Sequence, residues 1–262
     1  MHWRSKLIHP RAHAPPNFRS LAVPTYRGST VVFGRQADDP MIGAGIAHLI
    51  RKNTALIWTE SPGSVTMEVQ DVPAIAAAAH AHKVPVALDN TYSAGVLFDA
   101  FAHGVDVSMQ ALTKYVGGHS DLLLGTVSVA DAGLYEIVGS VHHQLGMAVS
   151  PDDCSLALRG LQTLGLRLER LEKTALDVAR WLGRHANIEA VLHPALESCA
   201  GHDHWRRDFA GSSSIFSVVF KERFSPAQVS AFADRLVRLN VGLEESCDLI
   251  LDLTQALDSM DA

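Results

Sequence analysis

The chain has few of the features that mark a secreted, zinc-binding or membrane-spanning protein. Its three cysteines are odd in number and form no CxxC pair, so neither a disulfide framework nor a thiolate zinc site is expected. Its longest apolar runs are too short to span a membrane. Residues 1–16 carry charges but no apolar core of a secretory signal. These absences predict a cytoplasmic protein without a membrane partner.

Charge is also scarce. Only 19% of the 262 residues are charged, and the formal net charge is -6. No basic block or basic-aromatic stripe occurs, which argues against nucleic acid as a partner. Few charges leave an unusual share of the surface apolar, and contact between subunits is one way to bury it. We therefore expect a homo-oligomer.

Two histidine pairs do not favour a metal site. His80 and His82 fall in a predicted helix, where residues two apart do not share a face. His202 and His204 fall in a predicted polar loop. No metal site is therefore expected.

Residues 1–40 form the first of three expected regions. They contain five of the 11 prolines, and proline fixes φ and lacks a backbone donor. The composition predicts an extended arm with one short strand at 29–33. The pattern leaves open whether this arm is a loose tail or crosses a subunit interface.

Strands and helices are expected to alternate from residue 41 to about 160, which predicts a mostly parallel sheet. Asp71 is well placed to cap the helix that starts there. The continuous apolar run 84–88 is typical of a strand buried on both faces. The expected helices are 42–52, 71–82 and 98–103, and the expected strands are 55–58, 84–88, 105–110 and 122–129.

Leucines at helical spacing predict one long helix over 150–185. A second pattern follows, with strands at 190–193, 215–220 and 237–241, and helices at 226–236 and 246–257, the last capped by Ser246. We place the domain boundary near residue 160. An α/β domain over 41–160 and a smaller α+β domain over 161–262 are therefore predicted.

Polar clusters follow three of the predicted strands. They lie at 60–64, 89–91 and 113–115. In an open α/β sheet ligands bind at the carboxyl ends of the strands, so the clusters predict one shared crevice. A lone lysine after a strand is usually a solvated charge, but Lys114 precedes a tight polar turn. A lysine amine and an aspartate at neighbouring strand ends are what a pyridoxal phosphate site requires.

Several segments together resemble the pyridoxal-phosphate enzymes of Cys/Met metabolism, and most closely their bacterial cystathionine β-lyase branch. The resemblance rests on the segments 60–69, 86–91, 111–121, 159–167, 193–196 and 205–213. It implies an aspartate-aminotransferase-like fold (pyridoxal-phosphate fold type I), with the α/β domain followed by the smaller domain. It also implies the family's homotetramer.

The resemblance assigns roles to four residues. It implies that Lys114 is the Schiff-base lysine and proton shuttle, and that Asp89 pairs with the pyridinium nitrogen. Thr113 resembles the phosphate-side hydroxyl, while Ala111 stands where many relatives have a second, serine contact. Arg238 resembles the arginine that binds the substrate α-carboxylate, a geometry that a planar guanidinium suits. Apart from the resemblance, a surface salt bridge is the more common role for an arginine such as Arg238, and His119 is expected to be a structural hydrogen-bonder.

The implied reaction is α,β-elimination of L-cystathionine to homocysteine, pyruvate and ammonia, in methionine biosynthesis. Two junctions depart from the family pattern, between Pro40 and Met41 and between Leu236 and Val237. The segment absent at the first junction includes the helix N-terminus that cradles the phosphate in relatives, so the α/β domain is expected to be incomplete. Two alternatives remain: a catalytically impaired remnant that serves as a structural subunit, and a related enzyme for another sulfur amino acid.

Overall fold

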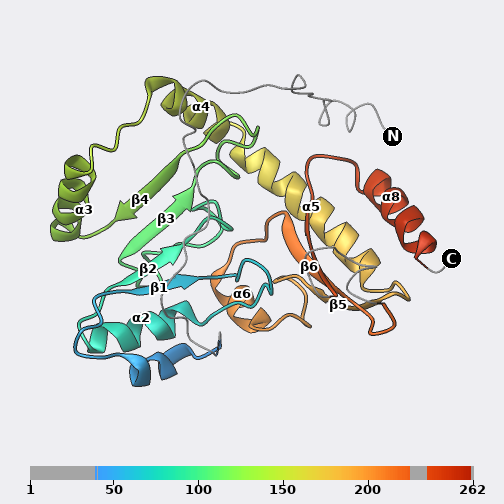
Figure 1. Ribbon diagram of the computed structural model, residues 1–262, viewed down its shortest axis with the longest axis horizontal. Helices are drawn as coiled ribbons and strands as arrows, with labels where there is room; N and C mark the ends of the chain where they lie inside the picture. The colour runs from blue at the N-terminus through green and yellow to red at the C-terminus, as the bar shows by residue number, and fades with distance from the viewer. Residues whose placement is uncertain (1–38, 40, 225–234, 261–262) are drawn as a thin grey trace, which may run out of the picture.

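The structure is a computed structural model, and it describes residues 39, 41–224 and 235–260 (Figure 1). The strand predicted at 29–33 and most of the helix predicted at 226–236 lie outside these residues. Two separate sheets are present, one of four strands and one of three. No described helix is both long and apolar enough to cross a membrane.

The first sheet is mostly parallel, as predicted. Its strands stand in chain order, β1 (Ile57–Glu60), β2 (Val86–Asp89), β3 (Val107–Ala111) and β4 (Gly125–Val129). The first three are parallel, and β4 runs antiparallel to β3. The carboxyl ends of β1, β2 and β3 therefore lie at one edge of the sheet, where the predicted polar clusters begin.

Helix α2 (Val72–Ala81) covers one face of this sheet. Asp71 caps it by accepting a hydrogen bond from the amide of Ala74 (3.3 Å), as predicted. Its apolar side chains pack against Val86 and Leu88, which point to the same face of β2. The helix expected at 42–52 is shorter and is a 3₁₀ helix, η1 (Gly43–Leu49).

One predicted helix is absent from the structure, and one helix that was not predicted is present. Residues 98–103 form turns rather than a helix, because the Asp99 side chain accepts the amide of Ala102 (3.1 Å) and Gly104 adopts a left-handed φ of 83°. Helix α3 (Ala132–Gln144) was not predicted. Its apolar residues Leu134, Ile137, Val138 and Val141 recur at helical spacing, so the sequence did contain a helical signal that was missed, although none of the helix's residues is buried.

The long helix predicted over 150–185 is two helices. They are α4 (Pro151–Leu161) and α5 (Leu164–Leu182), separated at Gln162 and Thr163. Gly160 lies so close to the Val116 carbonyl that any side chain there would overlap it. The end of α4 therefore packs against the chain that follows β3, close to the point where the two helices separate. The spacing of the leucines does not show this break.

The second sheet is antiparallel, with β5 (Ile188–Leu192), β6 (Ile215–Phe220) and β7 (Leu236–Asn240) in chain order. It packs with α5 and α8 (Ser246–Ser259) around one apolar core (Figure 1). Ser246 does not cap α8, because the N-cap is Glu245 and the Ser246 hydroxyl instead contacts Asp177 Oδ2 (3.3 Å). The predicted polar loop around His202 is helix α6 (His202–Asp208). The division at residue 160 stays a prediction.

Candidate active site

The site is built at the carboxyl ends of three neighbouring strands. Glu60 and Asp89 are the last residues of β1 and β2 and are direct partners in the parallel register. Lys114 follows the last residue of β3, Ala111, by three positions, and its amide donates to the Ala111 carbonyl (3.1 Å). The topology therefore brings Asp89 and Lys114 to the same edge.

Asp89 is held at the edge by its own neighbours. Its side chain is partly buried, and Oδ1 accepts the amide of Thr91 (2.9 Å). The Thr91 hydroxyl in turn accepts the amide of Ala111 (2.9 Å), which ties the end of β2 to the end of β3. One Asp89 oxygen takes part in no described hydrogen bond and is available to a ligand.

The Glu60 carboxylate interacts electrostatically with three of the predicted site residues, Asp89, Lys114 and Arg238. Although the residue as a whole is exposed, loss of water around its carboxylate raises its pKa. Hydrogen bonding from the Ser64 hydroxyl opposes this rise in pKa, the negative charge of Asp89 adds to it, and the positive charges of Lys114 and Arg238 oppose it. All three charged residues therefore lie within electrostatic reach of one carboxylate. Glu60 belongs to a predicted polar cluster, but no sequence signal gave it a role.

The Lys114 side chain is exposed, and its amine makes no hydrogen bond to any described residue. Its backbone, by contrast, is held in a closed turn. The Lys114 carbonyl accepts the amide of Gly118 (2.8 Å), and the amide of Gly117 donates to Leu112 (2.7 Å). His119 Nδ1 lies 2.8 Å from the Gly117 carbonyl, in keeping with the structural role expected for it. An unpaired amine on a rigid turn suits a group that must bond to a ligand.

Arg238 reaches the site from the second sheet. It lies on β7 opposite Ser217, and its Nη1 donates to the Ser64 carbonyl (2.9 Å). The Ser217 hydroxyl donates to the Val65 carbonyl (2.5 Å), so the loop after β1 is attached to the second sheet twice. Within the described residues Arg238 forms no ion pair, which does not favour the surface salt-bridge alternative.

Thr113 is less available than the sequence suggests. Its hydroxyl donates to the Leu124 carbonyl (3.2 Å) and accepts the Leu124 amide (3.0 Å). A hydroxyl has one hydrogen, and this one is committed to Leu124, the residue before β4. A phosphate could contact Thr113 as a donor only after the hydroxyl turned away from Leu124.

A buried polar network connects the lysine turn with the second sheet, and sequence patterns did not predict it. The Tyr115 hydroxyl lies 2.9 Å from Ser213 Oγ and 3.0 Å from Ser214 Oγ. Ser214 also bonds to Asn240 Oδ1 (2.6 Å), two residues beyond Arg238 on β7. Burial raises the pKa of the neighbouring Tyr92, whose hydroxyl accepts the Ser213 amide (3.3 Å). The Tyr92 phenol therefore stays neutral, and the network's hydroxyls act as hydrogen-bonding links.

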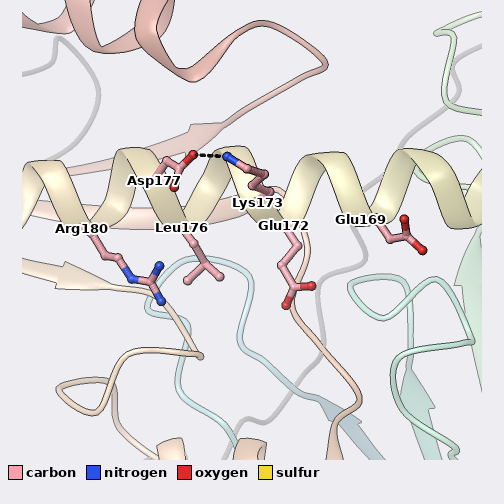
Figure 2. A pocket seen from close by; sticks show the side chains of 6 residues that line it. All are labelled: Glu169, Glu172, Lys173, Leu176, Asp177 and Arg180. Carbon is pink, nitrogen blue, oxygen red and sulfur yellow. Dashed lines mark hydrogen bonds and ion pairs between the residues drawn. The ribbon is translucent and has the colours of Figure 1, made fainter.

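Two hollows occur near these elements. One, of about 310 Å³, lies against α5 and contains none of the predicted site residues (Figure 2). Lys173 and Asp177 point to one side of the helix there and neutralise each other at 2.9 Å. The other, of about 380 Å³, includes Asn90 and Gln110 and adjoins the Asp89 strand end.

Comparisons with known proteins agree with this arrangement. Residues 29–234 match the family described as Cys/Met metabolism PLP-dependent enzyme. The chain is 46% identical over 228 residues to a putative cystathionine β-lyase of Saccharomyces cerevisiae, covering 85% of this chain and 67% of the relative. It is 40% identical over 257 residues to the cystathionine β-lyase MetC of Escherichia coli, covering 82% and 65%. The chain thus spans about two thirds of the length of these relatives.

A solved structure of cystathionine γ-lyase from Lactobacillus plantarum, complexed with L-serine, has the same fold. Its TM-score is 0.81 at 23% identity, covering 87% of this chain and 70% of that one. The likeness confirms the predicted aspartate-aminotransferase-like fold. With the family match over most of the sequence, it leads to one conclusion: the chain belongs to the Cys/Met metabolism pyridoxal-phosphate-dependent enzyme family.

Proposed function

We propose that this chain binds pyridoxal phosphate through Lys114 and Asp89 and promotes α,β-elimination of L-cystathionine, releasing homocysteine, pyruvate and ammonia. The observation that carries the proposal is the meeting of Lys114, Asp89 and Arg238 around Glu60 at one sheet edge. The similarity to proteins named cystathionine β-lyase supports this choice of substrate.

The residues present fit the cofactor at two of its three functional groups. The unpaired Lys114 amine suits its aldehyde, and the Asp89 carboxylate suits its ring nitrogen. The hydrogen bond from the Thr91 amide orients the Asp89 carboxylate. Because this bond uses only one carboxylate oxygen, the other can contact the ring nitrogen. When bound, the cofactor supplies an electron sink that stabilises negative charge at the substrate α-carbon.

The remaining work falls to side chains of this chain. Arg238 binds the substrate α-carboxylate, which orients the α-hydrogen toward Lys114. Lys114, freed when the substrate amine takes its place, would accept that proton on its amine nitrogen, and the Cβ–S bond would then break with both electrons leaving on sulfur. Protonation of the sulfur releases homocysteine, and water converts the three-carbon remainder to pyruvate and ammonia. In the cell this step would belong to methionine biosynthesis in the cytoplasm.

A homo-oligomer, with the family tetramer as the expected form, is part of the same proposal. Large apolar side chains remain exposed on α3 and on the edge strand β4. Tyr135 is 66% exposed, Ile137 62% and Val127 50%. Apolar surface of this kind is typical of subunit contacts.

A second candidate is an impaired family member that serves as a structural subunit. The observation that favours it is Thr113, whose hydrogen is committed to Leu124 instead of a phosphate. A charge-assisted hydrogen bond contributes about 1.5–3 kcal/mol, so a phosphate lacking several contacts would bind orders of magnitude more weakly. A third candidate, a relative acting on another sulfur amino acid, uses the same residues and differs only in substrate.

The deciding experiment combines borohydride trapping of the cofactor with thiol release from cystathionine. We expect an adduct on Lys114 and slow thiol release, below the roughly 10⁴ M⁻¹s⁻¹ typical of efficient enzymes. Lys114→Ala should abolish both, whereas the exposed Lys173→Ala on α5 should change neither. An undiminished adduct in Lys114→Ala would refute the assignment. A folded chain with neither adduct nor thiol release would favour the structural subunit, and release from another sulfur amino acid alone would favour the third candidate.

A further inference from the structure

The turn that presents Lys114 rests on a buried guanidinium. Arg167, in the first turns of α5, is only 8% exposed. Its Nη1 donates to the Tyr115 carbonyl, and its Nη2 donates to the carbonyls of Val116 (3.1 Å) and Gly160 (2.8 Å). Its Nε donates to the Thr163 hydroxyl (3.1 Å). One side chain therefore joins the two residues after Lys114 to the junction of α4 and α5.

The charge of Arg167 is not balanced by an acid. Within the described residues no carboxylate forms an ion pair with it, and burial lowers its pKa. Burying a charge without a counter-ion is costly unless strong hydrogen bonds replace the lost water. Three carbonyls and a hydroxyl do so here, and bonds from a charged donor are stronger than neutral ones. The guanidinium is therefore committed to the backbone of the turn.

The turn is packed closely against its neighbours. Gly118 has a left-handed φ of 72°, and a side chain at that position would overlap the Arg167 guanidinium. A side chain at Gly160 would overlap the Val116 carbonyl. The backbone is thus pressed against both the guanidinium and α4, while the Lys114 amine has no partner of its own. The described hydrogen bonds therefore restrain that amine only through the backbone.

We propose that Arg167 is a positioning residue for Lys114, holding the turn so that the amine faces Asp89 and Glu60. The effect of Arg167 on catalysis rests on the proposed function of Lys114. The effect of Arg167 on the position of the turn does not. The test therefore needs one readout without the cofactor and one with it.

The variants are Arg167→Met and Arg167→Lys, with Arg170→Met as the matched control on the same helix. Arg170 is tied elsewhere, to Glu245 Oε2 (2.7 Å) and the Glu244 carbonyl (3.0 Å). The first readout is amide hydrogen exchange of residues 112–118 in the cofactor-free chain. The second is the rate at which borohydride traps added pyridoxal phosphate on Lys114, with Lys114→Ala as the baseline.

In Arg167→Met we expect exchange over 112–118 to rise at least about tenfold, as loss of one charge-assisted hydrogen bond predicts. Trapping on Lys114 should fall by a similar factor. Arg167→Lys should lie between Met and the parent, because an ammonium keeps the charge but lacks the planar fork of donors with which the guanidinium reaches three carbonyls. In Arg170→Met both the exchange over 112–118 and the trapping rate should stay within about twofold of the parent, because Arg170 makes no described contact with the turn.

Unchanged exchange in the turn, or exchange that rises equally throughout the chain, would overturn the proposal. If Arg167→Met does not fold, Arg167→Lys decides the question by the same criteria. If the parent itself shows no Lys114 adduct, the proposed function fails while the exchange measurement still tests the hold on the turn.

Discussion

Acid should destabilise this protein through His193, a residue outside the proposed chemistry. His193 is fully buried, its Nδ1 accepts the Ala195 amide (3.1 Å), and its ring packs near Phe216. Its Nε2 has no hydrogen-bond partner among the described residues. Burial lowers the pKa of His193 to about 4, and the positive charge of Arg180 adds to the effect. The folded protein therefore favours the neutral imidazole.

The size of the effect follows from linkage between proton binding and folding. The unfolded chain binds the proton with an ordinary pKa of 6.5, and the folded chain with a pKa of about 4. Below pH 6.5 the unfolded chain gains the proton while the folded chain does not, so the free energy of unfolding decreases as the pH falls from 6.5 toward 4. The full loss in free energy of unfolding is about 3 kcal/mol, of which about 2 kcal/mol is lost by pH 5.

The measurement is urea unfolding at pH 7.5 and at pH 5. His193→Asn keeps an acceptor for the Ala195 amide but does not titrate, so it should lose about 2 kcal/mol less than the parent between these two values. The exposed His143→Asn should keep the parent's pH dependence. Asp177, whose pKa is lowered chiefly by hydrogen bonding from Lys173, loses its stabilisation only below its ordinary pKa of 3.8. A His193→Asn chain with the parent's pH dependence would refute the reasoning.

Two further predictions concern a carboxylate and a thiol. Asp89→Asn keeps the side-chain shape but removes the negative charge, so elimination should slow far more than cofactor binding weakens; equal losses in turnover and in affinity, measured by absorbance titration, would reduce Asp89 to a structural role. Cys199 is buried, its thiol donates to the Met67 carbonyl (3.3 Å), and burial followed by the charge of Glu68 raises its pKa to about 11. A disulfide exchange reagent at pH 8 should therefore titrate two of the three thiols in the folded chain, and rapid reaction of all three would contradict this.

Elements with strong local signals were predicted well. The helix at 71–82 has an aspartate cap and an alanine run, and α2 begins and ends within one residue of it. The strand at 215–220 matches β6 at both ends. Two other helices were not predicted. Helix α6 is short and polar, so it gives little periodic signal. Helix α3 contains glycines but does carry apolar residues at helical spacing (Leu134, Ile137, Val138 and Val141), and that signal was missed.

The site divides in a similar way. Asp89 and Lys114 were predicted to meet because parallel strands bring their carboxyl ends to one edge, a consequence of topology that sequence order already contains. Arg238 was placed by its resemblance to relatives, not by any local pattern. Its contact with Ser64 spans 174 positions, and only the folding of the second sheet against the loop after β1 produces it.

The sequence by itself determined the family and the parallel sheet, and it pointed to the two groups that we propose for the cofactor, because all of these depend on residue type and order along the chain. Only the tertiary structure decided the environment of each group. It placed Glu60 among three charges, committed the Thr113 hydroxyl to Leu124, and buried Arg167 beneath the lysine turn. Hydrogen-bond commitment and loss of water are properties of what surrounds an atom, and those surroundings come from segments far apart in the chain.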